Sequence, residues 1–151
     1  MPSAPNGGEP AGYRPPDLTL RGAEHVRRYL ETDGEVGYEW NGVPILLLTS
    51  TGRKTARPRT SALIYGTDGS DYLVVASAGG ADRHPAWYLN LLANPVAVVQ
   101  VKARRIPVTA HTAAPEERER LWRIVNDYWP NYEVYQSRTD RPIPVVALRP
   151  E

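Results

Sequence analysis

Short apolar runs separated by turn residues dominate the chain, and a few longer segments carry apolar positions at helical spacing. The short runs predict strands over residues 38–40, 43–48, 60–65, 71–77, 96–102, 106–111 and 145–148. The longer segments predict helices over residues 19–32, 86–93, 115–128 and 131–138. In the first of these helices Ala23, Val26 and Leu30 fall on one face, which is expected to pack on the sheet.

The turns indicate how the strands pair. Asn41-Gly42 accepts the positive φ angles of a type I′ turn, which predicts a hairpin of 38–40 with 43–48. Residues 67–70 are expected to join 60–65 to 71–77 as a second hairpin, and 96–102 pairs with 106–111 as a third. Closing such a sheet into a barrel removes its edges. The expected fold class is α+β, with a mostly antiparallel sheet of six to seven strands and flanking helices.

Composition limits the classes of protein. Residues 1–17 hold five Pro and three Gly, which predicts a disordered or loosely docked N-terminal arm before one domain over 18–151. The longest strongly apolar run, 45–48, is too short to span a bilayer, and no signal-peptide pattern is present. The absence of Cys excludes disulfides, thiol catalysis and Cys-ligated metal. These features fit a cytoplasmic location.

A basic, hydroxyl-rich segment over residues 49–60 is the strongest chemical signal. It contains four cations, Arg53, Lys54, Arg57 and Arg59, and no acid. Such a segment suits a multiply anionic ligand, but a solvated basic loop fits the pattern equally well. It lacks the upstream Gly of a nucleotide-binding loop, so an ATPase is not expected. The net charge of +1 disfavours nucleic acid, which needs a wider basic surface.

Other candidate side chains are less informative alone. His25, His84 and His111 lack partners at ligand spacing, so no metal site is predicted, and each is expected at the surface or a rim. Ser77 lies at a strand end before two glycines, where it is either a turn serine or a hydroxyl donor to a ligand. Phe is absent while Tyr and Trp number nine and four. A tyrosine cluster over residues 128–135 is either core or a pocket wall.

Three segments together resemble the deazaflavin (coenzyme F420)-dependent nitroreductase and quinone reductase family. They are Leu48-Thr49-Ser50-Thr51-Gly52-Arg53-Lys54-Thr55 with Pro58-Arg59, Ala76-Ser77-Ala78-Gly79-Gly80 with His84-Pro85-Ala86-Trp87-Tyr88-Leu89-Asn90-Leu91 and Asn94-Pro95, and Tyr132 through Tyr135-Gln136-Ser137 with Thr139-Asp140-Arg141. The resemblance covers about residues 20–149. It implies a split β-barrel similar to that of FMN-binding oxidases. It also implies coenzyme F420, an 8-hydroxy-5-deazaflavin with a phosphate and a polyglutamate tail.

The resemblance also implies roles for individual residues. The phosphate and acidic tail would be held by Arg53, Lys54 and Thr55. The rest of the cofactor would be contacted by Arg59, Thr60, Ser61, Ala62, Leu63, Ile64, Val75, Ala76, Ser77, Ala78, Ala86, Trp87, Tyr88, Leu89, Asn90 and Tyr132. The substrate pocket would be formed by Trp129, Tyr132 and Tyr135. Ser77 and Tyr135 would be the catalytic residues that stabilise or protonate the reduced acceptor. Trp129 stands where the nitroimidazole-activating member has a Tyr, so substrate range is expected to differ.

The implied activity is transfer of hydride from reduced F420 to a planar, electron-poor acceptor, a quinone first and nitroaromatics second. Two alternatives remain open: a protein that carries or stores the deazaflavin without turnover, and a basic loop that binds nucleic acid or anionic lipid. The expected protein is a monomer or homodimer without stable membrane insertion. Its quinone chemistry would suit transient contact with the inner face of the membrane.

Overall fold

The computed structural model describes residues 12–151; the part of the predicted arm formed by residues 1–11 lies outside the described residues. The elements in chain order are α1 (Gly22–Thr32), β1 (Glu39–Trp40), β2 (Val43–Thr51), β3 (Pro58–Ile64), β4 (Gly66–Asp68), β5 (Asp71–Val75), a 3-10 turn η1 (Ala78–Gly80), α2 (Ala86–Ala93), β6 (Val96–Val101), β7 (Arg104–Thr112), α3 (Pro115–Tyr128), α4 (Asn131–Ser137) and β8 (Val145–Pro150).

The strands form one sheet in the order β1-β2-β6-β7-β8-β5-β4, with β3 also paired to β2, and each pairing is antiparallel. The predicted α+β class is confirmed. The described sheet has eight strands, and the expectation of six to seven was too low because the three-residue β4 forms its own hairpin with β5.

The sheet curls around an interior core. Leu46 of β2 packs in the same cluster as Val74 of β5 and Val146 of β8, although β2 and β5 are far apart in the strand order. Tyr88 and Leu91 of α2 belong to this cluster, so α2 closes one end of the interior. Within the described residues β3 and β4 each pair on one side only. The molecule is therefore a split β-barrel, as the resemblance implied.

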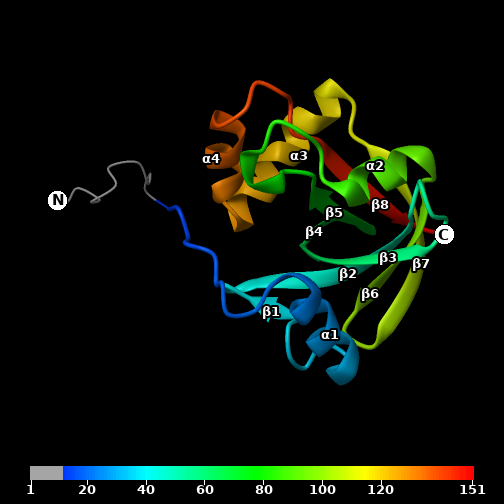
Figure 1. Cartoon of the computed structure of the whole chain (residues 1–151). Coiled ribbons are helices and arrows are strands. Elements are labelled where there is room, and N and C mark those ends of the chain that lie inside the picture. The colour runs from blue at the N-terminus through cyan, green and yellow to red at the C-terminus, as the bar shows by residue number, and fades with distance from the viewer. Residues whose placement is uncertain (1–11) are drawn as a thin grey trace.

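Helices cover the outer faces of the sheet on two sides. Ile45 and Leu47 of β2 face Tyr29 of α1, so β2 is buried on both faces and its sequence is continuously apolar. On the opposite side, Leu73 of β5 packs with Leu121 of α3. Figure 1 shows α1 below the sheet and α3 with α4 above it. The opening of the barrel lies between these two helical layers.

The predicted inward face of α1 was wrong. His25 and Tyr29 are the buried residues of this helix, while Ala23 and Leu30 are exposed and Val26 is partly buried. Tyr29 decides the orientation because its hydroxyl donates to the carbonyl oxygen of Ile45 at 3.0 Å, and a buried hydroxyl needs such a partner. The helix also begins three residues later than predicted.

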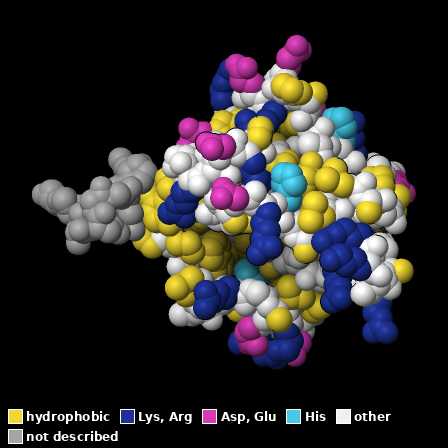
Figure 2. Space-filling view, turned by 45° about the horizontal axis from the view of Figure 1, so that its top comes forward, with side chains coloured by type: hydrophobic (Ala, Val, Ile, Leu, Met, Phe, Trp, Pro, Cys, Tyr) yellow, Lys and Arg dark blue, Asp and Glu magenta, His cyan; other side chains and the backbone are white. Residues whose placement is uncertain are grey.

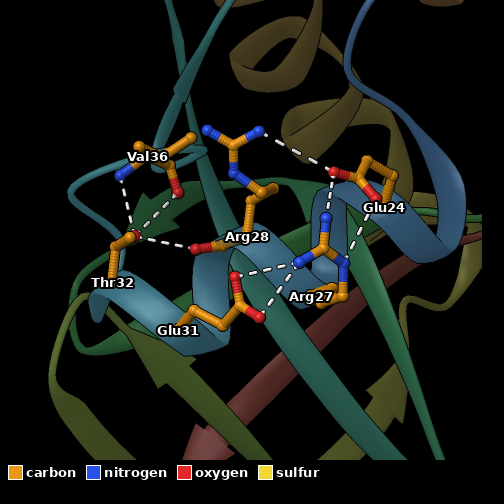
Figure 3. Close-up of polar contacts among 6 residues, drawn as sticks. All are labelled: Glu24, Arg27, Arg28, Glu31, Thr32 and Val36. Atoms are coloured by element: carbon orange, nitrogen blue, oxygen red, sulfur yellow. Dashed lines mark hydrogen bonds and ion pairs between the residues drawn. The ribbon is translucent and has the colours of Figure 1, made fainter.

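A charged outer face complements this orientation of α1 (Figure 3). Arg27 pairs with Glu24 at 2.5 Å and with Glu31 at 3.0 Å. Thr32 donates its hydroxyl hydrogen to the carbonyl oxygen of Arg28 at 2.8 Å and accepts the N–H of Val36 at 2.9 Å, which ties the helix end to the next turn. Exposed pairs of this kind contribute little stability, but they keep this face in water and the His25 face inward.

The predicted partner of residues 60–65 was also wrong. This strand, β3, pairs with β2 along the full register from Ile45↔Ile64 to Thr51↔Pro58, rather than with β5. The prediction ended the preceding strand at Leu48 and treated residues 49–60 as a basic, hydroxyl-rich loop. In the structure that stretch continues the ladder, and the hydroxyls of Thr49 and Thr60 lie 2.8 Å apart. The basic segment is therefore a hairpin whose tip comprises residues 52–57.

The described part of the arm, residues 12–17, lies against the domain. Arg14 exchanges two hydrogen bonds with the side chain of Asn131, at 2.8 and 2.7 Å. Its guanidinium lies 5.6 Å from the ring centroid of Trp129. Asp17 donates its backbone N–H to the side chain of Asn41 at 2.7 Å. This segment therefore covers the beginning of α4.

Candidate functional site

Two adjoining hollows open where the barrel is split. The first, here called the aromatic cavity, has a volume of about 340 Å³. The second, here called the basic cleft, has a volume of about 560 Å³. Trp87 at the start of α2 lines both, so the two hollows adjoin at this side chain. Figure 2 shows a hollow on this face with apolar side chains on one side and Lys and Arg side chains gathered on the other.

The basic cleft is built around the tip of the β2–β3 hairpin. Gly52 closes the tip by donating its N–H to the carbonyl oxygen of Arg57 at 2.8 Å, and Ala56 donates back to Gly52 at 2.8 Å. A Cβ on Gly52 would lie 2.9 Å from the hydroxyl oxygen of Thr55. A Cβ would also lie 3.1 Å from the backbone carbonyl oxygen of Arg57, so glycine suits this tight turn. The turn thus holds Arg53 and Lys54 at an exposed apex.

Asn90 of α2 connects this tip to the body of the protein. Its side chain is 3% exposed. The amide oxygen accepts the backbone N–H of Arg53 at 3.1 Å and a guanidinium N–H of Arg53 at 3.0 Å. The amide nitrogen lies 3.4 Å from the hydroxyl of Ser50. One buried side chain therefore fixes both the backbone and the guanidinium of Arg53.

The cations of the cleft lack acidic partners within the described residues. Arg27, Arg120 and Arg149 form ion pairs elsewhere on the surface. Across residues 12–151, by contrast, none of the four cations of the hairpin is paired with an acid. Unneutralised cations around a concave surface favour an anion. This distribution supports the anion-site interpretation over a merely solvated loop.

The wall of the aromatic cavity consists of packed rings. Trp129 is 1% exposed and lies 5.7 Å from Trp40 between ring centroids. Tyr132 and Tyr135 of α4 meet edge to face at 6.2 Å. Burial raises the pKa of Tyr132 well above its ordinary value, because the anion is poorly solvated there. Its phenol therefore stays neutral and can donate a hydrogen bond.

Arg141 fixes the turn that presents Ser77. Its guanidinium donates to the carbonyl oxygens of Ala76, Ser77 and Ala81 at 3.3, 3.0 and 2.8 Å. It also lies 3.1 Å from Nδ1 of His84. The pKa of His84 is lowered, first by burial and then by this guanidinium, so its neutral ring can accept the hydrogen bond. The resulting network holds the end of β5 rigidly.

Glycine lets this turn approach α4 closely. A Cβ on Gly80 would lie 2.7 Å from the carbonyl oxygen of Tyr135, and Arg138 donates to the carbonyl oxygen of Gly79 at 3.2 Å. The guanidinium of Arg138 also lies 5.6 Å from the ring centroid of Tyr135. Ser77 and Tyr135 are thereby brought to the same cavity, as the sequence-based prediction required.

Most predicted site residues line one of the two hollows. The aromatic cavity receives Ala62, Leu63, Ile64, Val75, Ser77, Ala78, Trp87, Trp129, Tyr132 and Tyr135. The basic cleft receives Arg53, Lys54, Thr55, Arg59, Thr60, Ser61, Ala86, Trp87 and Asn90.

Three predicted residues lie outside both hollows: Ala76, Tyr88 and Leu89. Strand alternation turns Ala76 away from the face that Val75 shares with the cavity. The N–H of Ala76 is bonded to Pro144 and its carbonyl to Arg141. Helical periodicity turns Tyr88 into the interior core, where its hydroxyl lies 2.9 Å from that of Thr112.

Several residues of the site were not among the predicted ones. Leu20, Arg21 and His25 line the aromatic cavity from the side of α1. His25 was expected at the surface or a rim, but the structure corrects this, because it is 4% exposed. Its spacing of four from Tyr29 is the signal that could have placed it on the buried face. Within the described residues no group of His, Asp and Glu gathers as a metal site requires.

Comparisons with known proteins agree with this geometry. A family model described as F420H(2)-dependent quinone reductase matches residues 21–150. An F420H(2)-dependent quinone reductase of Mycobacterium tuberculosis is 49% identical over 128 residues, which cover 82% of this chain and 86% of that protein. A solved F420-H2 dependent reductase, FDR-A, is 40% identical with a TM-score of 0.66, covering 70% of this chain and 94% of its own. A solved domain-swapped dimer is 38% identical with a TM-score of 0.69, covering 83% and 95%.

Proposed function

The chain belongs to the F420H(2)-dependent quinone reductase family. On this premise we propose that its two hollows bind different parts of one cofactor. The basic cleft holds the anionic tail of coenzyme F420, and the aromatic cavity holds the deazaflavin ring beside the acceptor. The observation that carries this assignment is that the two hollows adjoin at Trp87, which lines both. A ligand with a planar ring and an acidic tail needs an apolar and a cationic surface joined in this way.

The tail is held by charge. Lys54 and Arg59 are exposed in the cleft and Arg53 is anchored by Asn90. Guanidinium and ammonium groups form charge-assisted hydrogen bonds with phosphate and carboxylate oxygens. Thr55 adds a hydroxyl at the same apex, while residues 60–64 continue along β3 toward the aromatic cavity. These residues orient the cofactor and set its affinity.

The acceptor is held by rings and hydroxyls. When bound and reduced, the coenzyme supplies hydride to the acceptor. Trp129 and Tyr132 give the cavity its apolar wall, and the hydroxyl-bearing residues Ser77 and Tyr135 also line it. A neutral hydroxyl donates a hydrogen bond to a carbonyl oxygen on which negative charge develops. Quinones are the proposed acceptors, and nitroaromatics, which are also planar and electron-poor, are proposed as incidental ones.

Absorbance of reduced F420 tests this proposal. The purified protein is expected to oxidise reduced F420 with menadione, and more slowly with nitroaromatics. Fluorescence titration measures F420 binding separately. Tight binding without turnover across a panel of quinones would favour the carrier alternative, and absence of binding would refute both.

Assembly and location are separate proposals. No helix of residues 12–151 is long and apolar enough to cross a membrane. We propose a cytoplasmic monomer or homodimer that contacts the inner membrane face transiently to reach lipid-soluble quinones. Light scattering measures the assembly. Sedimentation with anionic vesicles tests the contact, and full recovery in the supernatant at low salt would contradict it.

A further inference from the structure

A buried histidine of α1 borders the aromatic cavity and has no role in the assignment above. His25 lines this cavity together with Ser77, Tyr132 and Tyr135, yet its side chain is almost inaccessible, at 4% exposed. Buried imidazoles that border a ligand cavity are candidates for proton transfer. We propose that His25 is a further catalytic residue, which contacts the acceptor and delivers the proton that completes its reduction. The proposal rests on the proposed function.

One ring nitrogen of His25 is already committed. Nε2 lies 2.8 Å from the carbonyl oxygen of Gly37. A carbonyl can only accept, so Nε2 carries a hydrogen and donates it. Gly37 has a φ of 100°, and a Cβ on it would lie 3.0 Å from Cδ2 of His25. The loop after α1 therefore closes on the imidazole edge and fixes both the ring plane and the tautomer.

The other nitrogen remains available. Nδ1 forms no hydrogen bond with any part of the chain between residues 12 and 151. With Nε2 held by Gly37, protonation of the ring places the additional hydrogen on Nδ1. A ring that borders the cavity and has one free nitrogen can then donate to an oxygen of a bound acceptor.

Charged groups of both signs lie near His25. The pKa of Asp17 is lowered, chiefly by hydrogen bonds from Thr19 and to a smaller extent by the electrostatic effect of His25. Arg21, which also lines the cavity, carries the opposite charge. From α4 the cavity is faced by the phenols of Tyr132 and Tyr135, and from the β5 end by the hydroxyl of Ser77.

Imidazole suits this step better than the hydroxyls opposite it. Ser and Tyr hydroxyls donate hydrogen bonds but give up protons reluctantly near neutral pH, whereas imidazolium does so readily. Reduction of a quinone to a hydroquinone requires one hydride and one proton. The coenzyme supplies the hydride, and the N–H bond at Nδ1 breaks as an O–H bond forms on the acceptor. Solvent water returns a proton to the ring.

His25→Gln is the most informative variant. The terminal amide of Gln can keep a hydrogen bond to the carbonyl of Gly37 but cannot titrate. We expect kcat with menadione to fall by roughly 100-fold or more, with F420 affinity and thermal unfolding close to wild type. The pH profile of kcat should differ from that of the wild type. His111→Gln is the matched control, since His111 lies on β7 and pairs with Glu117 at 3.1 Å. Wild-type kcat and pH profile in His25→Gln would overturn the proposal.

A readout that needs no turnover separates this proposal from the function it rests on. Menadione added to the ¹⁵N-labelled wild-type protein should shift the Nδ1 resonance of His25 and leave those of His111 unchanged. This experiment also serves if His25→Gln fails to fold. A protein that never oxidises reduced F420 but shows the shift would refute the proposed function and support contact of His25 with the acceptor. No shift at millimolar menadione would overturn the role of His25.

Discussion

The basic cleft and the aromatic cavity adjoin, but they are built in opposite ways. The cleft presents exposed cations on a hairpin tip, and its main support is the buried amide of Asn90. The cavity wall is part of the hydrophobic core, where Trp129 and Tyr132 share a cluster with Leu121 of α3. Changes in the cleft should therefore alter ligand affinity with little effect on folding. Changes in the wall should alter folding together with acceptor turnover.

Removal of Trp129 should cause the largest difference in stability between a wall variant and a cleft variant. Its ring is almost fully buried and packs on Trp40. Trp129→Ala is expected to lower the free energy of unfolding by about 3–5 kcal/mol, which corresponds to a fall in melting temperature of roughly 6–20 °C for a chain of this size. Calorimetry measures this change. Lys54→Ala in the cleft is the control and should stay within about 0.5 kcal/mol of wild type. Equal losses in the two variants would contradict the division between wall and cleft.

Asn90 is the expected exception within the cleft. Asn90→Leu leaves the N–H of Arg53 and the hydroxyl of Ser50 without their partner. An unsatisfied buried group costs roughly 1–3 kcal/mol, and release of the Arg53 guanidinium should weaken F420 binding by about tenfold. Denaturant unfolding and fluorescence titration measure the two effects. Asn94→Leu changes an exposed amide at the end of the same helix. If it weakened F420 binding as much, the anchoring role of Asn90 would be wrong.

Local patterns were sufficient to predict most elements from the sequence. Apolar periodicity and proline boundaries gave α2 and α3 at the bounds that the structure has. Asn41-Gly42 gave the first hairpin, and both residues have positive φ. The β2–β3 pairing was missed because hydroxylated residues with weak apolar contrast form the ladder there. Tertiary pairing decided that register, and local propensity could not.

Prediction of the site residues from the sequence was limited in the same way. The basic residues and the Ala76–Gly80 stretch were recognisable because their chemistry is concentrated in short segments. His25 and Arg141 are placed by contacts between distant parts of the chain. His25 is placed by the packing of α1 against β2. Arg141 is placed by hydrogen bonds to carbonyl groups about 65 residues away. The spacing of His25 from Tyr29 could have indicated a buried face, but only the folded arrangement shows that His25 borders the cavity.

Lys54→Ala should separate affinity from turnover in the cleft. Lys54 is exposed and forms no ion pair within the described chain. Loss of one charge contact with the anionic tail should weaken F420 binding by about tenfold, or ~1.4 kcal/mol, and make it less sensitive to salt. Turnover at saturating cofactor should be near wild type. Lys102, the only other lysine, lies over Tyr38 at 4.7 Å and provides the control. A comparable loss in Lys102→Ala would point to net charge rather than to a tail site.

Tyr135→Phe should have the smallest of these effects. It should slow turnover without changing stability or F420 affinity. The hydroxyl of Tyr135 has only a long contact, 3.5 Å, with Asn131 among the described residues, so its removal should leave stability and F420 affinity near wild type. Turnover with menadione should slow by roughly tenfold, because one hydrogen bond to the developing oxyanion is lost. Tyr128→Phe is the matched control. Its hydroxyl is buried against Gly66, away from the cavity, and has no hydrogen-bond partner among residues 12–151, so its removal should not change the rate. An unchanged rate in Tyr135→Phe would remove this hydroxyl from the mechanism and leave Ser77 and His25 as the donors to the acceptor.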